Sequence, residues 1–403
     1  MLQTAHLLIG RAGHRLGLSE GQVARLLRPD AEHHFEITLP GGQKHQAFRV
    51  QHSRRLGPYK GGIRFHPRVD IEEIRALALL MSLKTAALGL ELGGAKGGVE
   101  VDPRQLSAAE LEELSRAYVR HLAKHLGPQR DVPAPDVNTD SQVIDWMADE
   151  YARLSGDSSG AGFTGKSLSR GGSHGREAAT GRGGVIVLAT FLRQSGRNKK
   201  SLNYALQGFG NVGSYFATVA AAQQPGWKLV AATDSKGGVA NPSGLDARRL
   251  AAFKRSGQPL SGFAGGKPID NTQLLNLDVD ILVLAALEDA ITEANMRSVR
   301  ARLVVELANG PVSAAAHDYL SWRGTVILPD IIANAGGVVV SYLEWQQNLR
   351  AEQWPEEKVN ARLAASMSAA TKTVIKHSER HQLTLKEAAF ELAVQRLAGL
   401  PKN

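Results

Sequence analysis

Three glycines with the spacing Gly-x-Gly-x-x-Gly constrain the fold of this chain more than any other feature of its sequence; they are Gly208, Gly210 and Gly213. They follow an apolar run over 202–207 and precede a segment over 212–222 with helical periodicity. Asp234 ends the next apolar run, over 228–233. A strand, a glycine turn, a helix and a second strand ending in an acid are typical of a dinucleotide site, in which the pyrophosphate meets the helix N-terminus.

The middle third of the chain continues this alternation of strands and helices. Further short apolar runs, which we expect to be buried strands separated by helices, cover 281–286, 303–307 and 326–328. The pattern predicts an α/β fold with a doubly wound, Rossmann-like parallel sheet. After Gly337 the chain is predicted to be mostly helical, over 338–350, 356–378 and 385–397.

The first third mixes helices with strands and therefore predicts a second domain. Its predicted elements are a helix over 20–27, strands over 35–39 and 47–52 joined by a glycine turn at 41–42, and helices that begin after Asp70 and Ser107. Ser107 and Glu110 have the spacing of a capping box. We predict a mixed α/β domain for substrate binding and assembly over 1–178, to which the helices of 352–403 return. The dinucleotide-binding domain is expected over 179–351.

The composition narrows the class of protein. The chain has 403 residues and no Cys, which excludes a disulfide scaffold, a cysteine-ligated zinc and a thiol nucleophile. Its apolar runs are too short to span a bilayer and the N-terminus lacks a secretory h-region, so we expect a cytoplasmic protein with no membrane partner. His121 and His125 lie one helical turn apart without a third ligand nearby, so no metal is expected.

The chain carries a formal charge of +9, from 48 Lys and Arg against 39 Asp and Glu. Most of this charge falls in a glycine-rich stretch over 160–210 that holds eight Lys or Arg and one acid, Glu177. Such a stretch fits either a nucleic-acid surface or a site for small anions. Aromatic side chains are scarce there, which disfavours a stacking platform for single strands. We therefore expect no nucleic-acid partner.

Three lysines stand out because of their neighbours. Lys60 and Lys96 are flanked by glycines, in 57–65 and 92–98, so that backbone can pack closely around them and leave the ammonium groups facing a cleft. A flexible exposed loop is the alternative for the segment around Lys96. Lys84 lies among apolar residues of a predicted helix and needs either an anionic partner or a route to solvent.

Asp136 ends the segment 131–136, in which two prolines predict a rigid, irregular loop. Taken alone, such an acid is more often part of a turn than an acid–base catalyst. No Ser-His-Asp arrangement is identifiable in the chain.

Together these segments resemble the glutamate dehydrogenase family, within the wider group of amino-acid dehydrogenases. The resemblance extends from about residue 46 to about residue 350 and continues more faintly through the C-terminal helices. The stretches that carry it, in family order, are 57–67 (GPYKGGIRFHP), 92–103 (LGGAKGGVEVDP), 131–139 (DVPAPDVNT), 171–184 (GGSHGREAATGRGG), 207–213 (QGFGNVG), 234–238 (DSKGG) and 332–348 (IANAGGVVVSYLEWQQN).

The resemblance implies reversible oxidative deamination of L-glutamate to 2-oxoglutarate and ammonium, with hydride transfer to NAD or NADP. It implies that Lys96 activates water and that Asp136 moves protons to and from the amine. Lys84 is implied to pair with the substrate α-carboxylate, and Lys60 and Ser341 to bind the side-chain carboxylate. The residues implied to bind the cofactor are Thr180, Gly208, Gly210, Asn211, Val212, Gly213, Asp234, Ser235, Asn309 and Asn334.

The cofactor preference stays open at this point. Asp234 favours a free 2′-hydroxyl and hence NAD, whereas Ser235 and Lys236 directly after it have room for a 2′-phosphate. We lean slightly to NAD. Leu284 and Leu307 depart from the family pattern in segments that border the cofactor in relatives, which puts the affinity for the cofactor in question.

The family also implies a homo-hexamer built through the first domain, with the active site in the cleft between the domains. Relatives that act on leucine, phenylalanine or valine have apolar groups where Lys60 and Ser341 stand, and a buried lysine against an apolar side chain is costly. This favours glutamate as the substrate. The alternatives are a dehydrogenase of another amino acid and a catalytically weak regulatory subunit of a glutamate dehydrogenase assembly.

Overall fold

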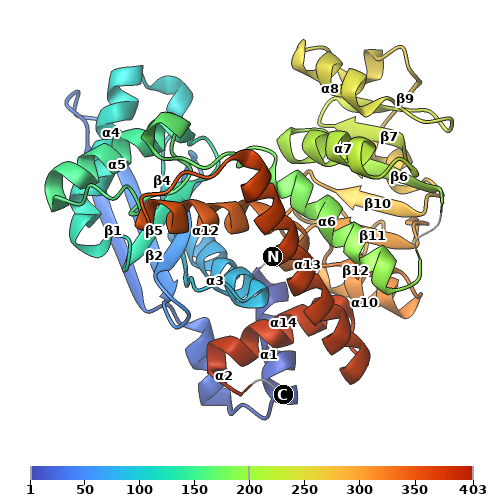
Figure 1. Ribbon diagram of the computed structural model, residues 1–403, viewed down its shortest axis with the longest axis horizontal. Coiled ribbons are helices and arrows are strands. Elements are labelled where there is room, and N and C mark those ends of the chain that lie inside the picture. Colours follow the sequence, from blue (N-terminus) through green and yellow to red (C-terminus); the bar gives the residue numbers. More distant parts are fainter. Residues whose placement is uncertain (1, 198–199, 402–403) are drawn as a thin grey trace. The chain divides into compact units, whose positions relative to one another are not determined.

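The computed structural model describes residues 2–197 and 200–401 (Figure 1). By their internal contacts these residues form two compact units. The N-terminal unit is built mainly from Ile9–Arg176 and Val338–Arg362, and the middle unit mainly from Glu177–Gly337 and Leu363–Phe390. Each unit has its own sheet and its own hydrophobic core.

A five-stranded sheet with the strand order β1-β2-β4-β3-β5 organises the N-terminal unit. Its strands are β1 (Ala31–Thr38), β2 (Lys44–Ser53), β3 (Tyr59–Phe65), β4 (Gly94–Val99) and β5 (Asp131–Pro135). β1 and β2 form the predicted hairpin, and Gly42 in its turn has a φ of +86° that favours glycine. β3 runs parallel to both β4 and β5, and β4 pairs antiparallel with β2.

Several helices belong wholly or in part to the N-terminal unit, and some of them begin or end at recognisable caps. They are α1 (Leu2–Arg15), α2 (Glu20–Leu27), α3 (Ile71–Leu88), α4 (Ala108–Leu122), α5 (Ser141–Ser155) and α12 (Gly336–Leu349), with short 3-10 turns η1 (Pro103–Gln105), η2 (Ala123–His125) and η3 (Leu168–Arg170). The Asp70 side chain accepts from the backbone N–H of Glu73 at the start of α3, which ends at Gly89 in the left-handed region. α4 begins at the predicted capping box of Ser107 and Glu110.

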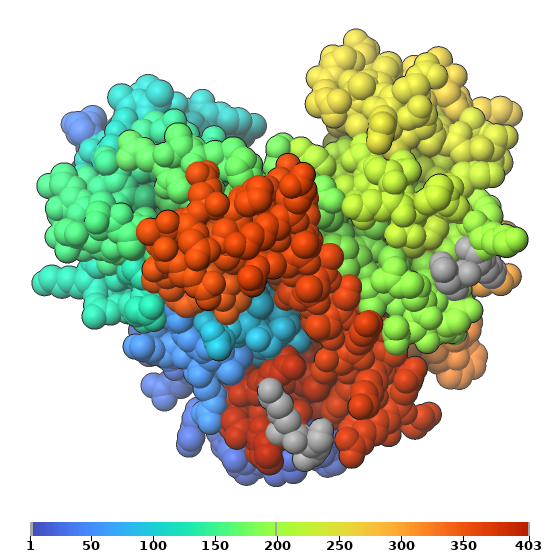
Figure 2. All heavy atoms as spheres, viewed as in Figure 1, coloured from blue at the N-terminus to red at the C-terminus, as the bar shows by residue number. Residues whose placement is uncertain are grey.

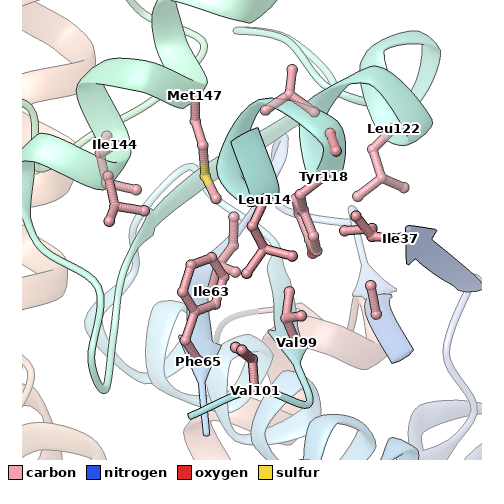
Figure 3. Close-up of a cluster of buried hydrophobic side chains, with 14 of the residues drawn as sticks. Ile37, Ile63, Phe65, Val99, Val101, Leu114, Tyr118, Leu122, Ile144 and Met147 are labelled. Carbon is pink, nitrogen blue, oxygen red and sulfur yellow. The ribbon is translucent and has the colours of Figure 1, made fainter. Parts of the chain in front are cut away.

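The core of this unit lies between its sheet and helices α4 and α5 (Figure 3). Leu114 and Tyr118 of α4 and Met147 of α5 belong to one buried cluster with Ile63 and Phe65 of β3. Nearly every residue of β3 is buried, including Lys60, whereas Arg64 is half-buried. A charged side chain on this strand is therefore taken into the interior.

The middle unit contains a seven-stranded sheet with the order β12-β11-β10-β6-β7-β8-β9. Its strands are β6 (Leu202–Gln207), β7 (Trp227–Asp234), β8 (Gly237–Ala240), β9 (Lys267–Ile269), β10 (Ile281–Leu284), β11 (Leu303–Glu306) and β12 (Val326–Leu328). The strands from β12 to β7 are parallel, whereas β8 and β9 extend the edge in antiparallel fashion. The prediction of a doubly wound α/β sheet is confirmed.

Helices surround this second sheet. They are α6 (Ala179–Gln194), α7 (Asn211–Gln223), α8 (Ala247–Arg255), α9 (Asn271–Leu275), α10 (Ala314–Trp322), α11 (Asp330–Ala333), α13 (Glu356–His381) and α14 (Leu385–Ala398), with the 3-10 turn η4 (Leu260–Gly262). In the space-filling view the side chains of this unit, green to yellow, close over the strands that the ribbon shows (Figure 2). The first turns of α13 and most of the second half of α14 group with the N-terminal unit.

The segment 131–136 differs from its prediction. Asp131–Pro135 is a strand, β5, rather than an irregular loop, because its residues pair in parallel register with β3. β5 lies at the edge of the sheet, where a proline without an N–H breaks no inner ladder. The glycine-rich segments around Lys60 and Lys96 are likewise buried strands, β3 and β4, which excludes the flexible-loop alternative.

The compact units also divide the C-terminal part differently from the predicted domains. Residues 338–351 group with the N-terminal unit, where Glu344 of α12 forms a buried ion pair with Lys166 at 2.9 Å. Residues 363–390 group with the middle unit, where Lys386 forms a buried ion pair with Glu306 at 2.8 Å. The sequence pattern marks these segments as helices but carries no signal for their tertiary partners.

Candidate active site

The strands β3, β4 and β5 bring two lysines and an aspartate together in the N-terminal unit. Lys60 on β3 pairs with Val132 of β5, and Lys96 lies on the neighbouring strand β4. A Cβ at Gly61 would lie 1.6 Å from the carbonyl oxygen of Ala95. Only glycine permits this close approach of the two strands, which explains why glycine flanks the lysines.

Lys96 and Asp136 are in direct contact. Lys96 is 5% exposed, and its ammonium donates to Asp136 Oδ2 at 2.5 Å. Arg64 Nε donates to the other carboxylate oxygen, Oδ1, at 2.9 Å. Asp136 therefore lies between two cations, and both of its oxygens are occupied in the free protein.

The pKa values of Lys96 and Asp136 are both lowered, for different reasons. Burial lowers the pKa of Lys96, and the positive charges of Arg64 and Arg49 lower it further, while Asp136 opposes the shift. Burial alone would raise the pKa of Asp136, but the charges of Lys96 and Arg64 outweigh it and hold this pKa below its ordinary value. Because Lys96 and Asp136 are in contact, a proton bound by one changes the proton affinity of the other.

Lys60 is a buried cation without a partner. It is 2% exposed, and within residues 2–197 and 200–401 no carboxylate lies within ion-pair distance of its ammonium. Its pKa falls well below the ordinary value because of burial first, and then because of the charges of Arg176 and Arg49; Glu344 opposes the shift. The Nε of Arg176 is also buried and has no hydrogen-bond partner in the described chain.

A buried lysine and a half-buried arginine whose charges act on each other without an ion-paired acid are unfavourable unless an anion joins them. Lys60 and Arg176 therefore define a site for an anionic group. Arg176 is a functional residue that the candidate set from the sequence omits. Arg176 lies in the basic, glycine-rich stretch 171–184, which could have marked it as a candidate. The sequence does not show that its charge acts on Lys60, which lies more than a hundred residues earlier.

Ser341 and Lys84 complete the polar residues of this unit that the sequence singles out. Ser341 lies on α12, is buried, and stands one turn before Glu344. The Glu344 carboxylate accepts from the backbone N–H of Gly165 at 2.8 Å and pairs with Lys166, so it holds the loop 160–172 against α12. Lys84 is buried on α3.

The glycine motif of the middle unit has the geometry of a phosphate-binding turn. Gly208 has a φ of +95°, and a Cβ there would lie 2.5 Å from the backbone of Ala285. The backbone N–H groups of Gly208 and Phe209 both donate to Thr233 O at 2.8 Å, which fixes the turn against β7. α7 then begins at Asn211 without a side-chain cap, so its first N–H groups are open to an anion.

Asp234 ends β7 as predicted, but its carboxylate already has partners. Oδ1 accepts from the Lys236 backbone N–H at 2.7 Å, and Oδ2 pairs with Lys254 of α8. Ser235 is exposed beside it. Lys254 was not among the sequence candidates, because nothing in its spacing shows that α8 returns to the end of β7.

The amide side chains of Asn309 and Asn334 lie together after β11 and β12. Asn334 Nδ2 donates to Ala308 O at 3.2 Å and to Asn309 Oδ1 at 3.0 Å. In the described residues the Oδ1 of Asn334 and the Oε1 of Gln207, at the end of β6, are buried acceptors without a donor. Such orphaned oxygens fit an N–H donor such as the carboxamide of a nicotinamide. Thr180 is half-buried in the first turn of α6.

The two leucines that depart from the family pattern are buried inside the middle unit. Leu284 ends β10 and belongs to the core of the sheet. Leu307 packs against Gly184 of α6, where a Cβ would lie 2.5 Å from a leucine methyl group. Both larger side chains thus fill space between secondary-structure elements.

The described residues hold no group of three or more His, Cys, Asp or Glu side chains arranged to bind a metal. No helix in the described ranges is long and apolar enough to cross a membrane.

Comparison with protein families gives two matches that together cover most of the chain. Residues 171–402 match the family described as Glutamate/Leucine/Phenylalanine/Valine dehydrogenase. Residues 30–153 match the Glu/Leu/Phe/Val dehydrogenase dimerisation domain.

Individual proteins with similar sequences and structures are described as glutamate dehydrogenases. The chain is 45% identical to glutamate dehydrogenase of Thermotoga maritima over 88% of this chain and 85% of that protein. It is 39% identical to NAD-specific glutamate dehydrogenase of Staphylococcus aureus over 97% of this chain and 95% of that protein. The structure is similar to hetero-hexameric glutamate dehydrogenase from Thermus thermophilus, with a TM-score of 0.91 and 34% identity over 99% of this chain and 95% of that one.

Proposed function

Because the chain belongs to the Glutamate/Leucine/Phenylalanine/Valine dehydrogenase family, we propose that it catalyses the reversible oxidative deamination of L-glutamate to 2-oxoglutarate and ammonium, with NAD or NADP. One observation carries the choice of substrate within the family. Lys60 is buried and Arg176 is half-buried with a buried Nε, the charge of Arg176 acts on Lys60, and neither has an ion-pair partner among the described residues. An amino acid with a carboxylate in its side chain supplies the missing negative charge.

The substrate carboxylates divide among the cations of the N-terminal unit. Lys84 binds the α-carboxylate, and Lys60 with Ser341 and Arg176 binds the side-chain carboxylate. The Lys166–Glu344 pair keeps α12, which carries Ser341, in register with the loop before Arg176. Charge-assisted hydrogen bonds at both ends of the substrate fix the position of its Cα between them.

The chemistry requires removal of a hydride from Cα, followed by hydrolysis of the imine. A bound nicotinamide ring would supply the hydride acceptor, and the Asp136 carboxylate would take the proton that the amine loses. Lys96 in its neutral form then takes a proton from the water that attacks Cα, since burial and neighbouring charges lower its pKa. Asp136 returns its proton to the amine nitrogen, and ammonia leaves as the 2-oxo group forms and the hydroxyl proton passes back to the Asp136 carboxylate. The contact between Lys96 and Asp136 allows the proton to move from one to the other.

The middle unit is proposed to hold the cofactor. The open N–H groups of α7 after Gly208, Gly210 and Gly213 receive the pyrophosphate, with Asn211 and Val212 in the first turn. Asp234 receives the adenosine ribose, and Asn309, Asn334 and Thr180 line the nicotinamide side. NAD is the favoured cofactor because of Asp234, and the relative from Staphylococcus aureus is described as NAD-specific. Ser235, Lys236 and Lys254 leave room for NADP.

We also propose a homo-hexamer in the cytoplasm. The Thermus thermophilus relative is described as a hetero-hexamer, which keeps a second candidate function open, that of a regulatory subunit beside a catalytic partner. Against that alternative, Lys60, Lys84, Lys96, Asp136 and Ser341 are all present, and the first four are charged groups that a non-catalytic subunit does not need. Light scattering of the purified chain measures its assembly directly.

The test is turnover by the purified chain alone. With L-glutamate and either cofactor, we expect formation of reduced nicotinamide, a higher kcat/KM with NAD, and little turnover of L-leucine, L-phenylalanine or L-valine. The Lys96→Met variant should be inactive and still bind NADH. Absence of activity with both cofactors, from a chain that forms hexamers, would favour the regulatory reading. Preference for an apolar amino acid would refute the assignment of glutamate.

A further inference from the structure

A buried ion pair in the middle unit includes Glu306, three residues before Asn309 of the proposed nicotinamide side. Glu306 is the last residue of β11, and Lys386 is the second residue of α14. The Lys386 ammonium donates to Glu306 Oε1 at 2.8 Å and to Oε2 at 3.0 Å, and both side chains are almost fully buried. The proposed mechanism makes no use of either residue.

The Glu306 carboxylate continues into a chain of hydrogen bonds. Its Oε2 accepts from the backbone N–H of Asp330, the first residue of α11, at 3.0 Å. The Asp330 side chain accepts from the backbone N–H of Gly310 at 2.8 Å and from that of Ile331 at 2.8 Å. Glu306 and Asp330 thereby clamp two loops, the one after β11 and the one after β12.

These two loops carry the amides that line the nicotinamide side. Asn309 lies between Glu306 and Gly310, and Asn334 follows α11. The backbone N–H of Asn334 donates to Asp330 O at 3.1 Å, so Asp330 also holds the backbone of Asn334 in place. The orientation of both amides therefore depends on where the Glu306 carboxylate is held.

Lys386 is the cation that balances the buried carboxylates of Glu306 and Asp330. Burial acts to raise the pKa of Glu306, and the Asp330 carboxylate acts in the same direction, whereas Lys386 opposes both. Burial lowers the pKa of His317 to about 4, so this neighbouring side chain is neutral near pH 7 and supplies no positive charge. Without Lys386, no cation among the described residues forms an ion pair with Glu306 or Asp330.

We propose that Lys386 is a positioning residue for the nicotinamide end of the cofactor: it holds Glu306, which through Asp330 sets the loops of Asn309 and Asn334. This inference rests on the proposed cofactor site. The adenosine and pyrophosphate ends of that site, at β7 and α7, share no hydrogen bond with this chain of contacts. The role of Lys386 should therefore be specific for the nicotinamide half.

The test compares two ligands, NADH and ADP-ribose, that differ by the nicotinamide ring alone. The Kd of NADH and the Kd of ADP-ribose are measured by fluorescence and calorimetry on the assembled wild-type protein and on Lys386→Met. We expect a roughly 10- to 100-fold rise in the Kd of NADH, the range for a displaced contact group, with little change in the Kd of ADP-ribose. In the Lys386→Met/Glu306→Gln double variant a neutral amide replaces the Glu306 carboxylate, so one buried negative charge fewer is left without a cation. The amide oxygen can still accept from the backbone N–H of Asp330, so NADH binding should partly recover.

Arg15→Met is the matched control, because Arg15 pairs at 2.5 Å with Glu391 of the same helix α14 but outside the chain of contacts to the amides. It should change neither Kd. Equal weakening of NADH and ADP-ribose in Lys386→Met would show a merely structural role, and unchanged binding of NADH would also overturn the proposal. Both measurements are independent of glutamate turnover, so a failure of the proposed substrate leaves this result interpretable.

Discussion

The unpaired lysine at position 60 gives the most direct test of the proposed site. In the free protein Lys60 is buried beside Arg176 and Arg49 with no acid within ion-pair distance in the described chain. Replacing it by methionine keeps most of its volume and removes the ammonium. We expect Lys60→Met to make the protein more stable and at the same time a poorer enzyme.

The size of both effects follows from the geometry. Replacing buried charge by an apolar side chain of similar volume stabilises by about 1–4 kcal/mol in other proteins. Each kcal/mol raises Tm by roughly 2–4 °C for a unit of this size. A lost hydrogen bond to a charged group costs about 1.5–3 kcal/mol of transition-state binding, which lowers kcat/KM for glutamate roughly 10- to 150-fold.

The gain in stability should depend on pH with a definite sign. The pKa of Lys60 in the folded protein lies well below the 10.5 of the unfolded chain, so the unfolded chain binds more protons between these two values. Wild-type stability therefore rises with pH across that window. The advantage of Lys60→Met should be largest at the low end of the window and shrink as the pH approaches 10.5.

Thermal unfolding followed by circular dichroism at several pH values, with glutamate kinetics in parallel, measures both effects. Lys44→Met is the control, since Lys44 is an exposed lysine of β2 and should change neither quantity. A Lys60→Met variant that unfolds at a lower temperature than wild type would show that Lys60 has a compensating partner. Unchanged kcat/KM would show that the side-chain carboxylate binds elsewhere.

Three further changes test specificity, cofactor choice and acid–base behaviour. Lys60→Leu with Ser341→Val should lower glutamate turnover and admit L-leucine, measured as the ratio of kcat/KM for the two substrates. Lys254→Met leaves the Asp234 carboxylate without its cation, so kcat/KM with NADP should fall roughly tenfold relative to NAD. Arg64 lowers the pKa of Lys96 and of the aspartate that it contacts, so Arg64→Gln should move the acid limb of the kcat/KM profile to higher pH.

The parts of the fold that local chemistry determines could be predicted from the sequence. The strand β6 and the helix α2 have the predicted bounds, and α4 begins at the predicted capping box. For the helices the deciding interactions lie within a few residues, such as the bond between Ser107 and the N–H of Glu110, and for β6 the short apolar run is itself the signal. β5 was missed because proline usually signals a loop, whereas an edge strand tolerates it.

Partners that are distant in the sequence could not be predicted. Lys254 pairs with Asp234 only because α8 returns to the end of β7. The charge of Arg176 acts on Lys60 only because the tertiary fold brings these distant parts of the chain near each other. The C-terminal helices show the same limit. Their periodicity predicts helices, but the partner of each, such as Glu306 for Lys386, depends on the tertiary fold.

The cations of the glycine-rich stretch differ in whether they have an acidic partner. This difference separates cations that stabilise the fold from cations that are available to bind a ligand. Lys166 is neutralised by Glu344, with further bonds to backbone, as expected of a cation that the fold itself needs. Arg176, ten residues later, is half-buried, its buried Nε has no hydrogen-bond partner in the described chain, and its charge acts on a second unpaired cation, Lys60. Folding alone gives no reason to keep two such charges together, because each destabilises the other. An anionic substrate that binds both does give a reason, so the unpaired pair rather than the total charge identifies the site.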